Sequence, residues 1–189
     1  MRLSVAKPNE TFPTLVTKRL RLRQFEARDL QGLHVCFGDE DAMRYWNSPA
    51  CKSEAETERW LNYLAKTTSP YDYGAWAVAE KRSDRCIGMV NYHHREARNA
   101  RLEIGYILAP AQQGRGLMME AVGKLVAYCL DELATHRIEA LIHPDNAASI
   151  RLVERLGFRC EGGPLRDRWR RGDGYMSVMM YALLAGERT

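Results

Sequence analysis

Residues 101–133 read RLEIGYILAPAQQGRGLMMEAVGKLVAYCLDEL. The first part, residues 102–108, is rich in β-branched and aromatic side chains and stops before Pro110, which cannot donate to a sheet ladder. From Leu117 onward the apolar residues recur with the i, i+3, i+4, i+7 spacing of a helix that buries one face. The stretch therefore predicts a strand, a glycine-bearing turn and a helix, and the rest of the chain is organised around it.

The turn between that strand and that helix predicts an anion-binding site. Gly114 and Gly116 permit positive φ angles and a close approach of a ligand to the backbone. The N–H groups that open a helix form a concave site that the helix dipole makes electropositive, and Arg115 adds a positive charge. A pyrophosphate would fit such a site, although a plain turn whose glycines relieve strain explains the same spacing.

Two familiar phosphate-binding loops are excluded. A Walker loop needs Lys and then Ser or Thr after its last glycine, whereas Leu117 and Met118 follow Gly116. The dinucleotide fingerprint needs a third glycine where Met119 stands, and it normally opens a βαβ domain. Here about a hundred residues precede the turn.

Composition narrows the class of protein. The 189 residues, 46% hydrophobic and 28% charged, fit a single globular domain over residues 1–189. A net charge of +4 suits an anionic cofactor but is too small to indicate direct nucleic-acid binding without a concentrated patch. No apolar run is long enough for a membrane span, and the N-terminal segment has no signal-peptide pattern. The five cysteines are scattered without C-x-x-C spacing, which favours reduced thiols in a cytoplasmic protein.

The flanking segments alternate between strand and helix patterns. Strands are expected at residues 15–25, 76–80, 86–93, 136–142, 158–161 and 175–184, and helices at 27–37, 53–66 and 147–156. Asn146 is a good N-cap for the last of these helices. Residues 162–174 are rich in arginine, carry Trp169, and are expected to form a long turn.

Two adjacent histidines, His93 and His94, suggest a metal pair at the end of the strand expected at residues 86–93. Neighbouring residues on a strand point to opposite faces, however, and no third ligand is evident. We therefore expect no metal site.

Four segments carry a family resemblance when they are taken in order. They read LVTKRLRLRQFEARDLQGL (residues 15–33), DEDAMRYW (39–46), RLEIGYIL leading into QQGRGLMMEAV (101–108 and 112–122), and HPDNAASIRLVERLGF (143–158). With these segments the chain resembles the GNAT N-acetyltransferases, and within them the RimJ/RimL-type ribosomal-protein N-terminal acetyltransferases. The resemblance covers nearly the whole chain.

The resemblance implies an α+β fold, the GNAT fold, in which helices flank a mostly antiparallel sheet of six to seven strands. The fourth and fifth strands would splay apart, and acetyl-CoA would lie in the gap, with no metal. The pantetheine would pair with backbone near Ile107 and Leu108, and Asn146 resembles the family asparagine that hydrogen-bonds this arm. The pyrophosphate would bind the N–H groups of Gln113, Gly114, Arg115, Gly116, Leu117 and Met118. Met118 departs from the Gly or Ala of the family pattern but keeps its N–H group.

The implied reaction is direct attack of a neutral amine on the thioester, with an N–H near Leu108 stabilising the oxyanion. Many GNAT enzymes use a tyrosine as general acid where this chain has Val153. Ser149 instead occupies the position of a serine used in the N-terminal acetyltransferase branch, and it lies one helical turn from Asn146. The alternative role for Ser149 is that of a helix-capping hydroxyl.

The candidate general base is Glu103, acting directly or through water. Side chains alternate along a strand, so Glu103 would face the acceptor cleft if Ile104 faces the core. The alternative is a solvated carboxylate or a partner for Arg101. Tyr92 and His93 are the other candidates, since histidine is the side chain whose ordinary titration range lies nearest neutrality.

Three function classes follow from these expectations. The leading one is an acetyl-CoA-dependent N-acetyltransferase that acts on a protein N-terminal amine. The second is the same chemistry on a small amine such as a polyamine, an amino acid or an aminoglycoside, because loops rather than the scaffold set the acceptor. The third is a non-catalytic acyl-CoA-binding protein. No nucleic acid or membrane partner is expected, and a homodimer is in keeping with the family.

Overall fold

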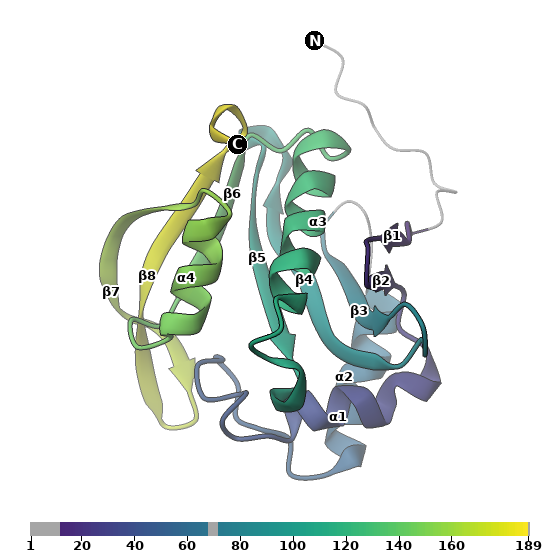
Figure 1. The fold of residues 1–189 in the computed structure, drawn as a ribbon. Helices are drawn as coiled ribbons and strands as arrows, with labels where there is room; N and C mark the ends of the chain where they lie inside the picture. The colour runs from purple at the N-terminus through teal and green to yellow at the C-terminus, as the bar shows by residue number, and fades with distance from the viewer. Residues whose placement is uncertain (1–11, 68–71, 189) are drawn as a thin grey trace.

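The structure, a computed structural model, describes residues 12–67 and 72–188 (Figure 1). These residues form one sheet of eight strands in the order β1-β2-β3-β4-β5-β6-β8-β7. The strands are β1 (Leu15–Val16), β2 (Leu20–Arg23), β3 (Gly74–Glu80), β4 (Cys86–Glu96), β5 (Arg101–Leu108), β6 (Arg137–Ile142), β7 (Arg159–Arg171) and β8 (Gly174–Leu184). The helices are α1 (Leu30–Phe37), α2 (Glu54–Thr67), α3 (Leu117–Asp131) and α4 (Ala147–Arg155). Every pair of neighbouring strands is antiparallel except β5 and β6.

The α+β architecture and the mostly antiparallel sheet are confirmed, and the strand count is higher than the six to seven predicted. The single strand expected at residues 15–25 is a tight hairpin of β1 and β2, in which Leu15 lies opposite Leu22. The long turn expected at residues 162–174 is mostly the strand β7, paired to β8 with several register shifts. The helix expected at residues 27–37 begins as a 3-10 turn, Ala27–Asp29, and becomes α-helical at Leu30.

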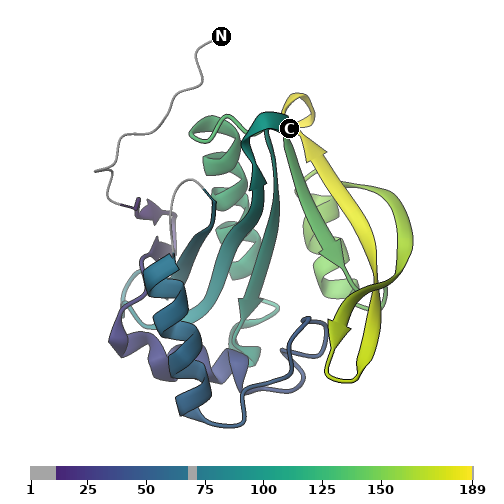
Figure 2. The same cartoon turned by 180° about the vertical axis from the view of Figure 1, so that it is seen from behind.

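The sheet separates two hydrophobic cores. Helices α3 and α4 cover one face, where Trp76, Ile104 and Leu125 are buried together. Helices α1 and α2 cover the β2–β4 part of the other face, where Leu33 and Ile107 are buried. Figures 1 and 2 show these two layers from opposite sides. Because side chains alternate along β5, its even-numbered residues face α3 and its odd-numbered residues face the opposite side.

The sheet opens between β5 and β6. The two strands pair in parallel only at Arg101↔Arg137, Leu102↔Ile138 and Glu103↔Glu139. Beyond Glu103 the ladder stops, although β5 continues to Leu108 and β6 to Ile142. Figure 2 shows the strands diverging from that point. The predicted splay is therefore present, between the strands labelled β5 and β6.

None of the helices formed by residues 12–67 and 72–188 combines the length and the apolar character needed to cross a membrane.

Three buried thiols should make this fold less stable at alkaline pH. Desolvation raises the pKa of Cys36, Cys86 and Cys129, to about 12 for Cys86. In the unfolded chain the same thiols have the ordinary cysteine pKa of about 8.5. Above that pH the folded chain binds more protons than the unfolded chain, so the free energy of unfolding falls as the pH rises.

We expect this free energy, measured by urea unfolding with a reductant present, to fall from about pH 8.5 to 9.5. This window lies below the range in which Tyr73, Tyr92 and Tyr106, whose pKa values burial also raises, add to the slope. The slope should be about 1.4 kcal/mol per pH unit for each buried thiol. Cys129→Ala should reduce the slope by about one third, whereas replacing the exposed Cys160 with Ala should leave it unchanged. A slope that is the same in the parent and in Cys129→Ala would contradict this account.

Candidate active site

A cavity of about 690 Å³ occupies the gap where the sheet opens. Its walls come from the diverging ends of β5 and β6, the turn before α3, and the first turns of α4. Residues of the loop between α1 and α2, two histidines of β4 and Trp169 of β7 complete it. Segments far apart in the sequence therefore meet at the one place where β5 has exposed backbone.

The turn before α3 has the geometry of an anion site. Gly114 and Gly116 have φ angles of 72° and 71°, the left-handed region that favours glycine. Gly116 is the N-cap of α3. Within the described part of the chain, the N–H groups of Gly114, Arg115 and Gly116 donate to no acceptor. The N–H of Gln113, also expected to bind the pyrophosphate, instead donates to the Pro110 carbonyl at 3.1 Å.

Glu120 and Arg19 brace this turn. The Glu120 carboxylate accepts hydrogen bonds from the Thr17 hydroxyl at 2.5 Å and from the Arg19 main-chain N–H at 2.7 Å. The Arg19 side chain bonds Glu120 at 2.6 Å and the Arg115 carbonyl at 2.9 Å. Burial raises the pKa of Glu120, but these hydrogen bonds and the Arg19 charge outweigh burial and lower it. Arg19, in the turn between β1 and β2, thus pairs with the Glu120 carboxylate of α3 and ties it to the carbonyl of Arg115.

Asn146 and Ser149, at the start of α4, face the cavity. Asn146 caps the helix, because its Oδ1 accepts the main-chain N–H of Ser149 at 3.2 Å. The cap does not use the Asn146 Nδ2 group, which can donate to a ligand. Both side chains line the cavity. Val153, which stands at the usual tyrosine position, is fully buried in the core.

Tyr106 is a candidate residue that the sequence reasoning missed. Its hydroxyl is buried and forms no hydrogen bond with any of the described residues. Ser149 is nevertheless close enough to affect the pKa of this hydroxyl. Burial raises the pKa of Tyr106 to about 12, against a smaller lowering by Ser149. The phenol therefore stays protonated at neutral pH beside the Ser149 hydroxyl.

Glu103 lies on the opposite face of β5 from the buried Ile104. The Glu103 side chain is 9% exposed, and its Oε1 is 3.1 Å from His93 Nε2. Its Oε2 is 3.3 Å from His94 Nδ1. Burial raises the pKa of Glu103, but hydrogen bonds and charge from the two histidines outweigh it, so the net shift is downward. Tyr92 points to the other face and packs on Trp76, away from the cavity.

The expectation that His93 and His94 point to opposite faces is wrong. The β4–β5 register shifts between His93 and Glu96, and His94 has a φ angle of 49°. This bulge turns the second imidazole back toward Glu103. One ligand atom from each of the three side chains lies within 4.8 Å of the others, so they could hold a metal ion.

Contacts across the mouth of the cavity hold the α1–α2 loop in place. The Tyr45 and His143 rings stack with centroids 4.9 Å apart. Arg171 of β7 donates hydrogen bonds to the carbonyls of Arg44 at 2.5 Å and Met43 at 3.2 Å. The loop and the β7–β8 hairpin therefore form one rim of the cavity.

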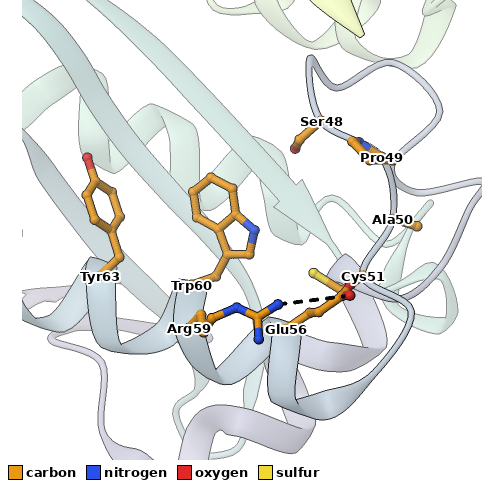
Figure 3. Close-up of a pocket in the computed structure, with 8 residues that line it drawn as sticks. All are labelled: Ser48, Pro49, Ala50, Cys51, Glu56, Arg59, Trp60 and Tyr63. Atoms are coloured by element: carbon orange, nitrogen blue, oxygen red, sulfur yellow. Dashed lines mark ion pairs between the residues drawn. The ribbon is translucent and has the colours of Figure 1, made fainter. Parts of the chain in front are cut away.

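A second, shallower pocket of about 570 Å³ lies on the outer side of the same loop, against α2 (Figure 3). Trp60 and Tyr63, which are 41% and 50% exposed, project from the same side of the helix. Ser48 and Pro49 form the opposite wall. The residues just before them, Trp46 and Asn47, line the main cavity, so one loop borders both depressions.

The opened sheet with an amide-lined turn beside it places this chain among the acyltransferases. The chain belongs to the GNAT acetyltransferase family, whose acetyltransferase domain matches residues 19–159. It is 31% identical over 174 residues to p20 of Bacillus licheniformis, named as an uncharacterized N-acetyltransferase, covering 92% of this chain and 97% of that one. A GNAT-family acetyltransferase structure from Bacillus anthracis is 25% identical, with a TM-score of 0.82 over 93% of this chain and 100% of that one.

Two further relatives differ in their named acceptors. The structure of RimL, a ribosomal-protein alpha-N-acetyltransferase in complex with coenzyme A, superposes with a TM-score of 0.78 at 20% identity, over 91% of this chain and 98% of that one. A spermidine N(1)-acetyltransferase of Vibrio cholerae is 28% identical over 78% of this chain and 83% of its own length. The family and the N-acetyltransferase class are thus established, and RimL-type proteins are among the structural neighbours.

Proposed function

We propose that this N-acetyltransferase moves the acetyl group of acetyl-CoA to the α-amine of a polypeptide N-terminus. The observation that carries the proposal is the arrangement around the gap between β5 and β6. Unpaired amides of the turn before α3 lie on one side of it, and the Glu103 carboxylate lies on the other. A cofactor bound on the first side can present its thioester to an amine on the second.

The cofactor would be held mainly by backbone. We place the pyrophosphate on the N–H groups of Gly114, Arg115 and Gly116 and on those of Leu117 and Met118, which open α3. Gln113 is left out of this set, because its N–H is occupied and its side-chain Nε2 donates to the Leu108 carbonyl at 3.1 Å. The pantetheine would run along the unpaired edge at Ile107 and Leu108, where the Nδ2 group of Asn146 can reach it.

The chemistry is a balanced exchange of two bonds. The nitrogen of the amine forms a bond to the thioester carbon while the carbon–sulfur bond breaks. Glu103 draws in the amine and accepts its proton, directly or through water, and Ser149 gives a proton to the leaving thiolate. Glu103 then releases its proton to water and Ser149 takes one up from water, so both groups return to their starting states. Tyr106 lies beside Ser149, and its protonated phenol can donate to that hydroxyl once the cofactor is bound. An N–H near Leu108 stabilises the oxyanion.

The shallow pocket on α2 supports a polypeptide acceptor. Residues 46 and 47 line the main cavity and residues 48 and 49 line the second pocket, so a polypeptide whose first residue lies at Glu103 could cross this loop and end against Trp60 and Tyr63. Exposed aromatic side chains of this kind are common anchors for polypeptides. Polyamines are the second candidate, since a spermidine acetyltransferase is among the relatives. The acidic groups at the cavity, Glu103 and Asp41, are few for a polycation.

The direct test is release of coenzyme A thiol from acetyl-CoA, measured side by side with N-terminal peptides and small amines. Turnover with peptides at a kcat/KM at least tenfold above that for spermidine is expected. The reverse ranking would assign the polyamine reaction. No release with any amine, in a protein that binds coenzyme A by calorimetry, would overturn the proposal.

Trp60→Ala should separate peptides from small amines. Loss of an aromatic surface of this size from a half-exposed site should raise KM about tenfold for peptides of several residues, without changing kcat. KM for a small amine should stay the same, because Trp60 lies outside the main cavity. Steady-state kinetics with peptides of increasing length measure this effect. Val16→Ala, at an exposed apolar residue of β1 that lines neither depression, is the control.

A further inference from the structure

The bulge in β4 brings together three side chains that a regular strand would separate. His93 lies opposite Glu103 in the register, and the next pair is Glu96↔Arg101, so β4 has one extra residue there. The left-handed His94, with φ of 49°, absorbs that residue. A non-glycine residue in this region is strained, and such strain persists where the surrounding structure enforces it. The result is a carboxylate with an imidazole nitrogen against each of its oxygens.

We propose that His93, His94 and Glu103 form a binding site for a divalent transition-metal ion, zinc in the first place. Two imidazole nitrogens and one carboxylate oxygen are the donor set of open zinc sites, which leave a further position for water or substrate. With bond lengths near 2.0–2.2 Å, neighbouring ligands of a tetrahedral zinc lie roughly 3.3 Å apart. His93 Nε2 lies 3.1 Å from Oε1 of Glu103, and His94 Nδ1 lies 3.3 Å from Oε2, so each imidazole contacts a different oxygen of one carboxylate. One ligand atom from each side chain already lies within 4.8 Å of the others, and closing that spread to the tetrahedral spacing requires only small side-chain movements.

Exposure gives this site an entrance and an open side. The side chains of Glu103, His93 and His94 are 9%, 26% and 74% exposed, so the carboxylate forms the floor and His94 stands at the surface. All three line the main cavity, which supplies room for the remaining ligands of the ion.

The surroundings also predict a limit to the affinity. Among the described residues, the buried His93 Nδ1 has no hydrogen-bond partner. A metal-binding histidine normally donates its second ring nitrogen to a partner, and loss of that partner typically weakens binding by about 10–100-fold. The site should therefore bind zinc reversibly and release it to a chelator.

A bound ion would have a functional consequence, which rests on the proposed function. It would occupy the carboxylate that receives the amine, so zinc should inhibit acetyl transfer competitively with the amine and not with acetyl-CoA. Metal binding itself is independent of that function, and it can be measured without any acetyl transfer.

The test uses the full-length protein stripped of metal with a chelator. Calorimetry with Zn²⁺ should show one ion bound per chain, and Co²⁺ should give the visible absorption of a four- or five-coordinate ion, which Zn²⁺ then displaces. His94→Gly should weaken binding at least tenfold. Glycine suits the left-handed backbone at this position, so this variant should fold at least as well as the parent. His136→Ala, at an exposed histidine outside the cavity, should bind like the parent.

Failure of a folded parent protein to bind either ion would overturn the site, as would equal binding by the parent and His94→Gly. These failures are distinct from failure of the proposed function. Acetyl transfer by a protein that binds no metal refutes the site alone. One bound ion per chain, lost in His94→Gly, in a protein that acetylates no amine refutes the proposed function alone.

Discussion

Glu103→Gln is expected to lower kcat/KM for the amine by about 10²–10⁴-fold in metal-free buffer, the usual contribution of a general acid–base group. The substitution keeps the shape of the side chain and removes its charge. The downward pKa shift of Glu103 keeps this carboxylate ionised, which favours attraction of an ammonium group but makes it a weak base. Because Glu103 is a weak base, we expect it to pass the proton of the amine on to water rather than to keep it.

Glu139→Gln is a close control for this change. Glu139 lies opposite Glu103 in the parallel register, and each of the two residues, counted with its backbone, is 7% exposed. It pairs with Arg101 at 3.1 Å and Arg137 at 2.6 Å and does not line the cavity. Its loss should affect stability more than turnover. Coenzyme A affinity by calorimetry should be unchanged in both variants, and a Glu103→Gln enzyme within about threefold of the parent would remove Glu103 from the mechanism.

The central strand, turn and helix could be predicted from sequence because each buries one face. Residues 102–108 and the apolar spacing after Leu117 match β5 and α3 closely. The start of β7 lies in the strand predicted at residues 158–161, but the rest of it, residues 162–171, could not be predicted, because none of its residues is buried and most are exposed. A strand exposed on both faces carries no alternation, and its glycines and proline read as a turn.

In the candidate site, features set by a local sequence pattern could be predicted, and features set by contacts between distant residues could not. The amide-lined turn is visible in the sequence because Gly114 and Gly116 are needed for its φ angles. Tyr106 was missed because it alternates with apolar residues of β5 and reads as a core residue. His94 was misplaced because one extra residue in a strand leaves no mark on composition. The contact of Arg19 with Glu120 joins residues about a hundred positions apart, which no local pattern reveals.

Ser149→Ala should lower kcat by about 10²–10⁴-fold while leaving KM for acetyl-CoA nearly unchanged, if its hydroxyl protonates the thiolate. The structure makes this substitution informative, because the helix cap uses the main-chain N–H of Ser149 and survives the loss of the hydroxyl. A loss of activity therefore would not report a broken helix. Circular dichroism and thermal unfolding of the variant check this point.

Two further variants, Ser149→Thr and Tyr106→Phe, show whether the hydroxyl of Ser149 or that of Tyr106 donates the proton to the thiolate. Ser149→Thr keeps a hydroxyl and should retain most of the activity that Ser149→Ala loses. Tyr106→Phe should lower kcat by less than about tenfold, since the change removes at most one hydrogen bond to the neighbouring Ser149, a bond that is not formed in this structure. If Tyr106→Phe instead loses as much as Ser149→Ala is expected to lose, and Ser149→Ala remains active, the phenol whose pKa is raised to about 12 is the proton donor. Ser149 then only positions it, and the order of the two roles is reversed.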